Sequence, residues 1–179
     1  MAAVAGSGSA AADPPPLVGA NYTHYSITGC SLQGTGIVAG YDKDGVRETV
    51  RAQLAAMRAS GMASLRLVLW HTSEITGREW GVVPSAGGEL PEPYRSNLAT
   101  YLTDVREAGF EQLTVAFAPA AANDPRAKSY DATRFEENWR FLENVRPLIK
   151  RYGPPSTHID LINEGAPRAR YRRWSAGAR

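Results

Sequence analysis

The sequence predicts an α/β protein built on a parallel sheet, and three observations lead to this prediction. Short apolar runs alternate with longer segments of helical periodicity. A glycine that tolerates the left-handed conformation stands at the end of each predicted helix, at Gly61, Gly109 and Gly153. The predicted strands begin at positions 18, 65, 113 and 159, so consecutive starts are 47, 48 and 46 residues apart. Such regular alternation is typical of right-handed crossovers between parallel strands.

The first predicted unit consists of a strand over residues 18–25, a glycine-rich loop and a helix over residues 44–60. Asp44 is the expected N-cap, because its carboxylate can accept hydrogen bonds from the first backbone N–H groups of the helix. Apolar residues at helical spacing predict the face that packs on the sheet. They are Val46, Val50, Leu54 and Met57.

The pattern then recurs. A strand over residues 65–70 precedes a helix over 96–108, and a strand over 113–118 precedes a helix with Thr133 as its expected N-cap. A fourth strand covers residues 159–163. The loops that follow strands are the long ones, and β/α-barrel enzymes place their active sites at that end of the strands. A doubly wound open sheet has the same alternation, so the pattern alone establishes only the α/β class.

Composition excludes several classes of protein. The 179 residues are 43% hydrophobic and 21% charged, which is ordinary for a globular protein. No apolar run reaches the roughly 18 residues that span a bilayer, and one cysteine cannot form an internal disulfide. The net charge of +2 arises in the last twelve residues, which hold five arginines and no acidic residue. We expect neither nucleic acid nor a membrane as a partner, since a short basic run is usually a solvated chain end.

The two ends of the chain differ from the body. Residues 1–16 predict a disordered leader or the remnant of a secretory signal peptide, because alanines at 10–12 before Asp13 have the small-residue form of a cleavage site. This predicts a secreted or extracellular protein, with a cytoplasmic one as the alternative. Residues 17–165 form the predicted folded unit, and residues 166–179 a basic tail or the start of a fourth helix.

Residues 17–165 resemble the N-terminal half of a clan A glycoside hydrolase, one of the cellulase-like retaining β/α-barrel glycosidases. The clan carries an Asn-Glu pair at the end of its fourth strand, where Asn163 and Glu164 stand. Its second strand often carries an arginine, which Arg66 matches within the segment GMASLRLVLWH. The resemblance implies an incomplete TIM-type barrel of about four of eight units. It also implies hydrolysis of O-glycosidic bonds in an oligosaccharide, polysaccharide or glycoside, without a cofactor.

The resemblance also implies roles for individual residues. Glu164 would be the catalytic general acid/base, which protonates the leaving oxygen and then activates water. Asn163 would bind the 2-hydroxyl of the sugar, and Arg66 would orient the nucleophile. Further candidates for sugar contacts follow the predicted strands, and core packing is the alternative for the first of them. They are Trp70, His71, Tyr22 and His24.

The sequence departs from the family in three places. Gly165 replaces the usual proline, and residues 117–119 (Phe-Ala-Pro) stand where many members have a histidine. The family's nucleophile lies on a seventh strand, and retention needs two carboxyl groups about 5–5.5 Å apart. We therefore expect this chain alone to be an inactive fragment. The alternatives are a non-catalytic sugar-binding protein and an unrelated α/β domain.

Strand parity offers a test of the barrel prediction. Arg66 and Asp160 are each the second residue of an even-numbered predicted strand, and even strands contribute to the same interior layers of a barrel. We expect the two side chains to meet inside the barrel, where each compensates the buried charge of the other. The alternative places Asp160 against a helix or solvent. Open sheet edges would also favour self-association.

Two patterns in the sequence bear on a cofactor or metal site. Gly34, Gly36 and Gly40 resemble a loose dinucleotide fingerprint, but the spacing differs by one and the loop does not join strand to helix directly. We predict an ordinary flexible loop there. His24 and His71 with Glu164 offer zinc ligands, but no His-x-His pair or helical histidine spacing supports a metal site.

Overall fold

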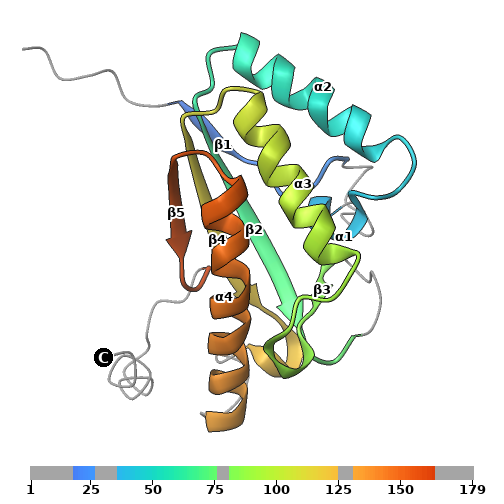
Figure 1. Cartoon of the computed structure of the whole chain (residues 1–179), viewed down its shortest axis with the longest axis vertical. Coiled ribbons are helices and arrows are strands. Elements are labelled where there is room, and N and C mark those ends of the chain that lie inside the picture. The colour runs from blue at the N-terminus through green and yellow to red at the C-terminus, as the bar shows by residue number, and fades with distance from the viewer. Residues whose placement is uncertain (1–17, 27–35, 76–80, 125–130, 164–179) are drawn as a thin grey trace, which may run out of the picture.

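The structure is a computed structural model that describes residues 18–26, 36–75, 81–124 and 131–163. Its centre is a parallel sheet with strand order β1-β2-β4-β5, and a short β3 pairs with β2. The strands are β1 (Gly19–Asn21), β2 (Ser64–Thr72), β3 (Val83–Pro84), β4 (Gln112–Pro119) and β5 (Ser156–Asp160). Successive strand–helix units therefore add neighbouring strands to one sheet, as Figure 1 shows.

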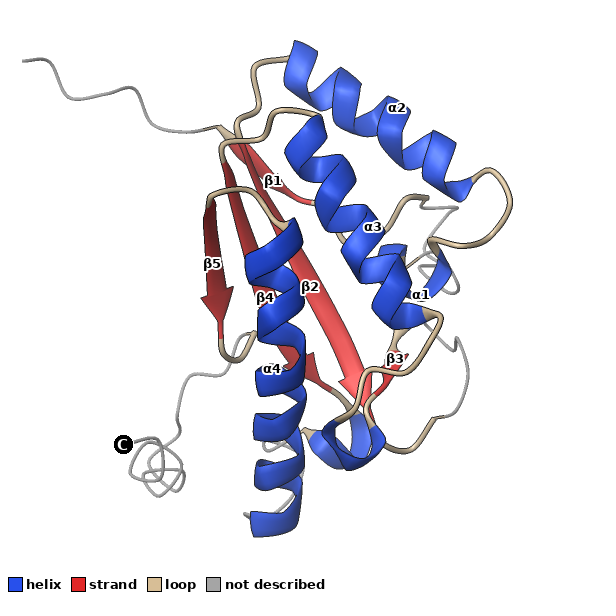
Figure 2. Cartoon of the chain, in the orientation of Figure 1, coloured by secondary structure: helices blue, strands red, loops and turns tan. Residues whose placement is uncertain are grey.

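Three long helices cover one face of this sheet (Figure 2). The long helices are α2 (Val46–Ala59), α3 (Tyr94–Glu107) and α4 (Ala132–Tyr152), and the short helix α1 (Ile37–Gly40) precedes them. A single hydrophobic core joins their apolar faces to the sheet. No helix in the described ranges packs on the opposite face, which we call the open face.

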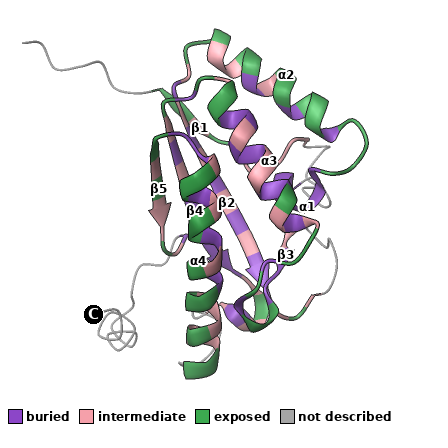
Figure 3. Cartoon of the chain, in the orientation of Figure 1, coloured by how far each residue is buried: buried purple, intermediate pink, exposed green. Residues whose placement is uncertain are grey.

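The alternation of β2 sorts its side chains between the two faces. Leu65, Leu67 and Leu69 are buried beneath the helices, whereas Arg66 and Trp70 are only half-buried on the open face. Successive side chains of a strand point to opposite faces, so this one burial pattern fixes which residues each face carries. Figure 3 shows the same separation in the helices, where buried positions turn toward the sheet.

All four predicted strands and all three predicted helices are present, with shifted boundaries. The predicted N-cap Asp44 is wrong, because the helix follows Gly45, whose φ of 72° is left-handed and which makes no side-chain cap. The predicted cap Thr133 is also wrong, since Asp131 accepts hydrogen bonds from the backbone N–H groups of Thr133 and Arg134. The fourth strand ends at Asp160, where the chain turns and the N–H of Ile162 binds the Asp160 carboxylate.

The prediction of a flexible glycine loop fails at its end, where residues 37–40 form the buried helix α1. Gly36 precedes this helix and packs directly on Gly81. A Cβ at Gly36 would lie 2.5 Å from the Gly81 Cα, so the glycine is needed for close backbone approach. Gly34 and the rest of residues 27–35 lie outside the described residues.

A buried carboxylate ties α2 to α3. Asp104 of α3 accepts hydrogen bonds from Arg47 Nε at 2.8 Å, Arg51 Nη1 at 2.7 Å and the Tyr41 hydroxyl at 2.7 Å. Burial alone would raise the pKa of Asp104, but the hydrogen bonds from Arg47 and Tyr41 outweigh it and lower that pKa. The contact fixes the helix layer against which the sheet is held.

Candidate functional site

A polar cluster on the open face joins β2 to the turn after β5. Arg66 Nη2 donates to Asp160 Oδ2 at 2.8 Å and to Asn163 Oδ1 at 2.8 Å. The parity of the strands puts Arg66 and Asp160 on the same face, and the predicted meeting of these two side chains is confirmed.

The cluster is less buried than the sequence led us to expect. The Arg66 and Asp160 side chains are 31% and 37% exposed, because no described element covers the open face. The predicted mutual compensation of two buried charges therefore does not apply in this structure. An ion pair with this exposure contributes at most about 1 kcal/mol to stability.

Asn163 is held from two directions. Its backbone N–H donates to the Phe117 carbonyl of β4 at 2.7 Å, while its side-chain oxygen accepts from Arg66. The residue is buried although it lies beyond the last strand. Among the described residues nothing accepts a hydrogen bond from its Nδ2. Glu164, the predicted acid/base, lies outside the described residues.

Trp70 shares the open face with this cluster. It lies four residues beyond Arg66 on β2, which corresponds to about 13 Å along an extended strand. Its ring is half-buried, so part of its surface can contact a ligand. The structure thus puts Arg66, Asn163 and Trp70 on one face of the sheet.

The structure places His71 away from these residues. Its side chain is 1% exposed in the helix-covered core, where the ring stacks on Phe141 at 4.3 Å between centroids. His71 Nδ1 lies 3.0 Å from the Ser85 hydroxyl. Burial lowers the pKa of His71 to about 3, so the imidazole is neutral at physiological pH. The expected sugar contact is therefore replaced by a packing role.

Tyr22 and His24 also lie apart from the cluster. The Tyr22 backbone N–H donates to the Arg66 carbonyl at 2.8 Å, but the ring turns to the helix layer and its hydroxyl donates to Gln53 of α2. Burial raises the Tyr22 pKa, so the hydroxyl stays protonated. His24 lies with Tyr22 beside α2, and burial lowers its pKa.

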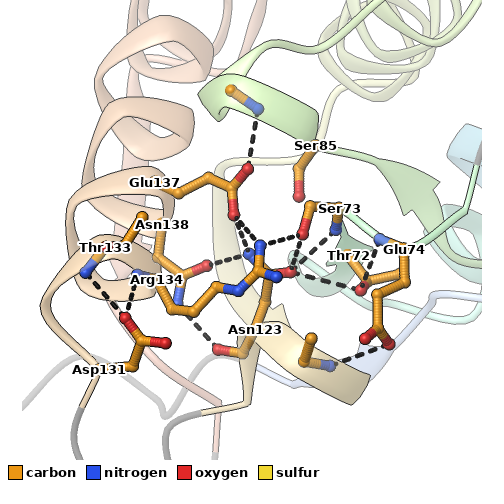
Figure 4. A network of polar contacts seen from close by, with 12 residues as sticks. Thr72, Ser73, Glu74, Ser85, Asn123, Asp131, Thr133, Arg134, Glu137 and Asn138 are labelled. Carbon is orange, nitrogen blue, oxygen red and sulfur yellow. Dashed lines mark hydrogen bonds and ion pairs between the residues drawn. The ribbon is translucent and has the colours of Figure 1, made fainter.

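A second polar network at the C-terminal ends of β2 and β4 was not predicted (Figure 4). Its centre is the buried Asn123, whose Oδ1 accepts from the Ser73 N–H at 2.8 Å and whose Nδ2 donates to Glu137 and Asn138 of α4. Burial alone would raise the pKa of Glu137, but hydrogen bonds from Arg134, the Gly87 N–H and Asn123 lower it. The polar atoms of the Asn123 side chain are thus satisfied, which gives the network a structural role in holding strand ends to α4.

One weak pattern in the sequence is consistent with this network. Arg134, Glu137 and Asn138 are spaced i, i+3 and i+4 and so share one face of α4. Nothing local indicates that Asn123 is their partner, because that contact depends on the path of the intervening loop.

No group of three or more histidine, cysteine or acidic side chains in the described ranges is arranged to hold a metal ion. Within the same ranges, no helix is both long and apolar enough to cross a membrane. Comparisons with protein-family models, with curated proteins and with solved structures found no match to this chain.

Proposed function

We propose that this chain carries the acid/base half of a retaining glycosidase site on about four of the eight units of a TIM-type β/α barrel. The observation that carries the proposal is the pair of hydrogen bonds from Arg66 to Asp160 and Asn163. These bonds fix an amide side chain on the open face, one residue before Glu164.

The arrangement of the sheet supports the barrel. Each strand–helix unit adds the next strand beside the previous one, and the described helices lie on one face. A doubly wound sheet reverses its strand order at a switch point and carries helices on both faces. A singly wound parallel sheet is the type that closes into a barrel, with its uncovered face toward the interior.

The proposed mechanism assigns a separate role to each of several neighbouring residues. Glu164 donates a proton to the leaving oxygen and later removes one from water. Asn163 donates its Nδ2 hydrogen to the sugar 2-hydroxyl, a bond that strengthens in the transition state. Arg66 and Asp160 act as positioning residues for Asn163, because they contact it or its partner rather than the reacting atoms.

Retention needs a second carboxyl group about 5–5.5 Å from the acid/base. Asp160 carries the one carboxylate that strand alternation places on the open face of the described strands, and Arg66 already binds it. The nucleophile is therefore not one of the described strand residues, and the family resemblance implies that it lies on a seventh strand. It follows that this chain alone should bind a glycoside without hydrolysing it.

A non-catalytic sugar-binding protein is the second candidate. The same observation favours it, since Trp70, Asn163 and Arg66 supply an aromatic surface, a donor and a cation on one face. The two candidates differ in whether Glu164 transfers a proton.

An external nucleophile separates them. Phenyl glycosides of both anomeric configurations are incubated with the chain and azide, and phenol release is followed. Azide forms a bond to the anomeric carbon, the C–O bonding electrons leave with the phenyl oxygen, and Glu164 supplies the proton that yields phenol. We expect azide-dependent release that Glu164→Gln abolishes and that the control Glu143→Gln, an exposed carboxylate on α4, leaves unchanged. Binding without any Glu164-dependent release would favour the second candidate, and the absence of binding would overturn both.

A further inference from the structure

A pocket of about 350 Å³ lies at the start of β5, between the C-terminal ends of α3 and α4. In Figure 1 this is the upper end of α4 and β5. Thr157 and Ile159 of β5 line the pocket, and they alternate with Asp160 of the open face. The pocket therefore opens on the other side of the strand and is separate from the candidate glycosidase site.

Four cationic side chains line this pocket, and no carboxylate does. They are Arg106 of α3 and Arg146, Lys150 and Arg151 of α4 and its end. All four residues are exposed, and none takes part in an ion pair within the described ranges. Arg146 and Lys150 are spaced i, i+4, where like charges destabilise a helix by a few tenths of a kcal/mol.

Favourable interaction with the helix dipoles explains the position of only some of these cations. Arg106, Lys150 and Arg151 lie in the last turns of α3 and α4, where cations interact favourably with the helix dipole. Arg146 lies one turn earlier, outside the range of that effect, yet it faces the same pocket. Arg106 Nη1 donates to the Arg151 carbonyl at 3.3 Å, which brings α3 to the end of α4 and completes the basic rim.

The rest of the pocket wall is apolar. Ile149 is buried at its base, and Ile159, Pro154 and Pro155 contribute the remaining hydrocarbon surface. A ligand suited to this pocket combines an anionic group with an apolar or planar body. Four cations call for more than one negative charge, and a phosphate monoester carries about −1.5 to −2 at neutral pH with three strong acceptor oxygens. Arginine donates to such oxygens in a bidentate geometry.

We propose that this pocket binds an organic phosphate monoester, with the phosphoryl group on the basic rim and the organic body on the apolar wall. The proposal is independent of the glycosidase proposal, because it uses other residues on the other side of β5. In this proposal Arg146 and Lys150 are the main anion ligands, since neither makes a side-chain hydrogen bond or ion pair with another described residue.

Isothermal titration of the full 179-residue chain with phenyl phosphate, at constant ionic strength, tests the proposal. We expect binding that is at least about tenfold weaker in the Arg146→Ala/Lys150→Ala double variant, because charge-assisted hydrogen bonds are lost. Arg140→Ala is the control, since it removes one positive charge, half the number removed by the double variant, from an exposed position of α4 outside the pocket. Inorganic phosphate should bind more weakly than phenyl phosphate, because it lacks the organic body.

A second measurement locates the site. In amide NMR spectra, phenyl phosphate should shift the resonances of Gly153 and Thr157, which line the pocket. Should the double variant fail to fold by thermal melting, Arg106→Gln on α3 replaces it and should also weaken binding. Equal weakening by Arg140→Ala, unchanged binding in the pocket variants or no binding at millimolar concentration would overturn the proposal. Unchanged binding would assign any phosphate contact to the arginine-rich residues 168–179 instead.

Discussion

Arg66 of β2 and Asp160 of β5 meet across the intervening strand β4, with Nη2 and Oδ2 2.8 Å apart. In the strand register, Arg66 lies opposite Thr114 and Asp160 lies opposite Ala116. The small side chains of β4 leave room for the arginine to reach the second strand. The pair therefore links β2 to β5 across β4 on the open face.

A double-mutant cycle should give Arg66 and Asp160 a coupling free energy of at most about 1 kcal/mol. The reason is that both side chains are about one-third exposed, so water screens the pair. The cycle compares Arg66→Ala, Asp160→Ala and the double variant by urea denaturation. A coupling of several kcal/mol would mean that the pair is covered in solution and would contradict the exposure seen here.

Asn163→Asp should separate the structural role of Asn163 from its proposed contact with a sugar. The aspartate keeps an acceptor for Arg66, so the free energy of unfolding should change by less than about 1 kcal/mol, but it loses the Nδ2 donor. Binding of a glycoside should therefore weaken, whereas Asn163→Ala should also lower stability by about 1–2 kcal/mol.

Urea denaturation and titration with the best-bound phenyl glycoside measure the two effects. Asn144→Asp on α4 is the control for the change of charge, since Asn144 binds Gly88 and Glu89 away from the open face. If Asn163→Asp bound the glycoside as well as the unchanged protein, the role assigned to the amide would be wrong.

The sequence predicted the elements with clear periodicity and missed those without it. Residues 37–40 follow several glycines and are too few to show a helical period, so α1 could not be inferred. β3 has two residues, and its pairing with β2 depends on tertiary contact rather than on a local pattern.

At the candidate site, strand alternation was the reliable guide. It predicted the contact between Arg66 and Asp160, and it also explains why His71 differs. His71 is an odd number of positions from Arg66 and must face the helices. No such rule predicts the contacts of Asn123. Its partners on α4 and after β2 are brought together by loops whose course the sequence does not indicate.

His71 should make stability depend on pH between about 6.5 and 3. Burial lowers its folded-state pKa to about 3, whereas the unfolded chain binds a proton below about 6.5. The unfolded state then holds more protons, so the free energy of unfolding falls as pH falls, by up to about 1.4 kcal/mol per pH unit.

Urea denaturation from pH 7 to pH 5 measures this slope. In His71→Phe the slope should be smaller, because a phenyl ring keeps the stacking on Phe141 without a titrating group. His158→Gln is the control, since His158 is exposed on β5. An equal slope in His71→Phe and the unchanged protein would contradict the burial of a neutral imidazole.

Asp104→Asn should destabilise the protein by about 2–3 kcal/mol, more than the loss of any one of its partners. The carboxylate has no exposed surface and accepts charge-assisted bonds from Arg47 and Arg51 and a bond from Tyr41, so its replacement weakens three contacts together. Arg51→Ala should cost about 1 kcal/mol or less, because its side chain is half-exposed and Arg47 remains.

The lowered pKa of Asp104 adds a second loss of stability on acidification, at lower pH than the loss that begins with His71. The contribution of Asp104 is present above the unfolded pKa of about 3.9 and is lost as pH falls through the lower folded pKa. Thermal melts below pH 4 should therefore show a steeper loss of stability in the unchanged protein than in Asp104→Asn, and parallel curves would show that this carboxylate does not hold α2 against α3.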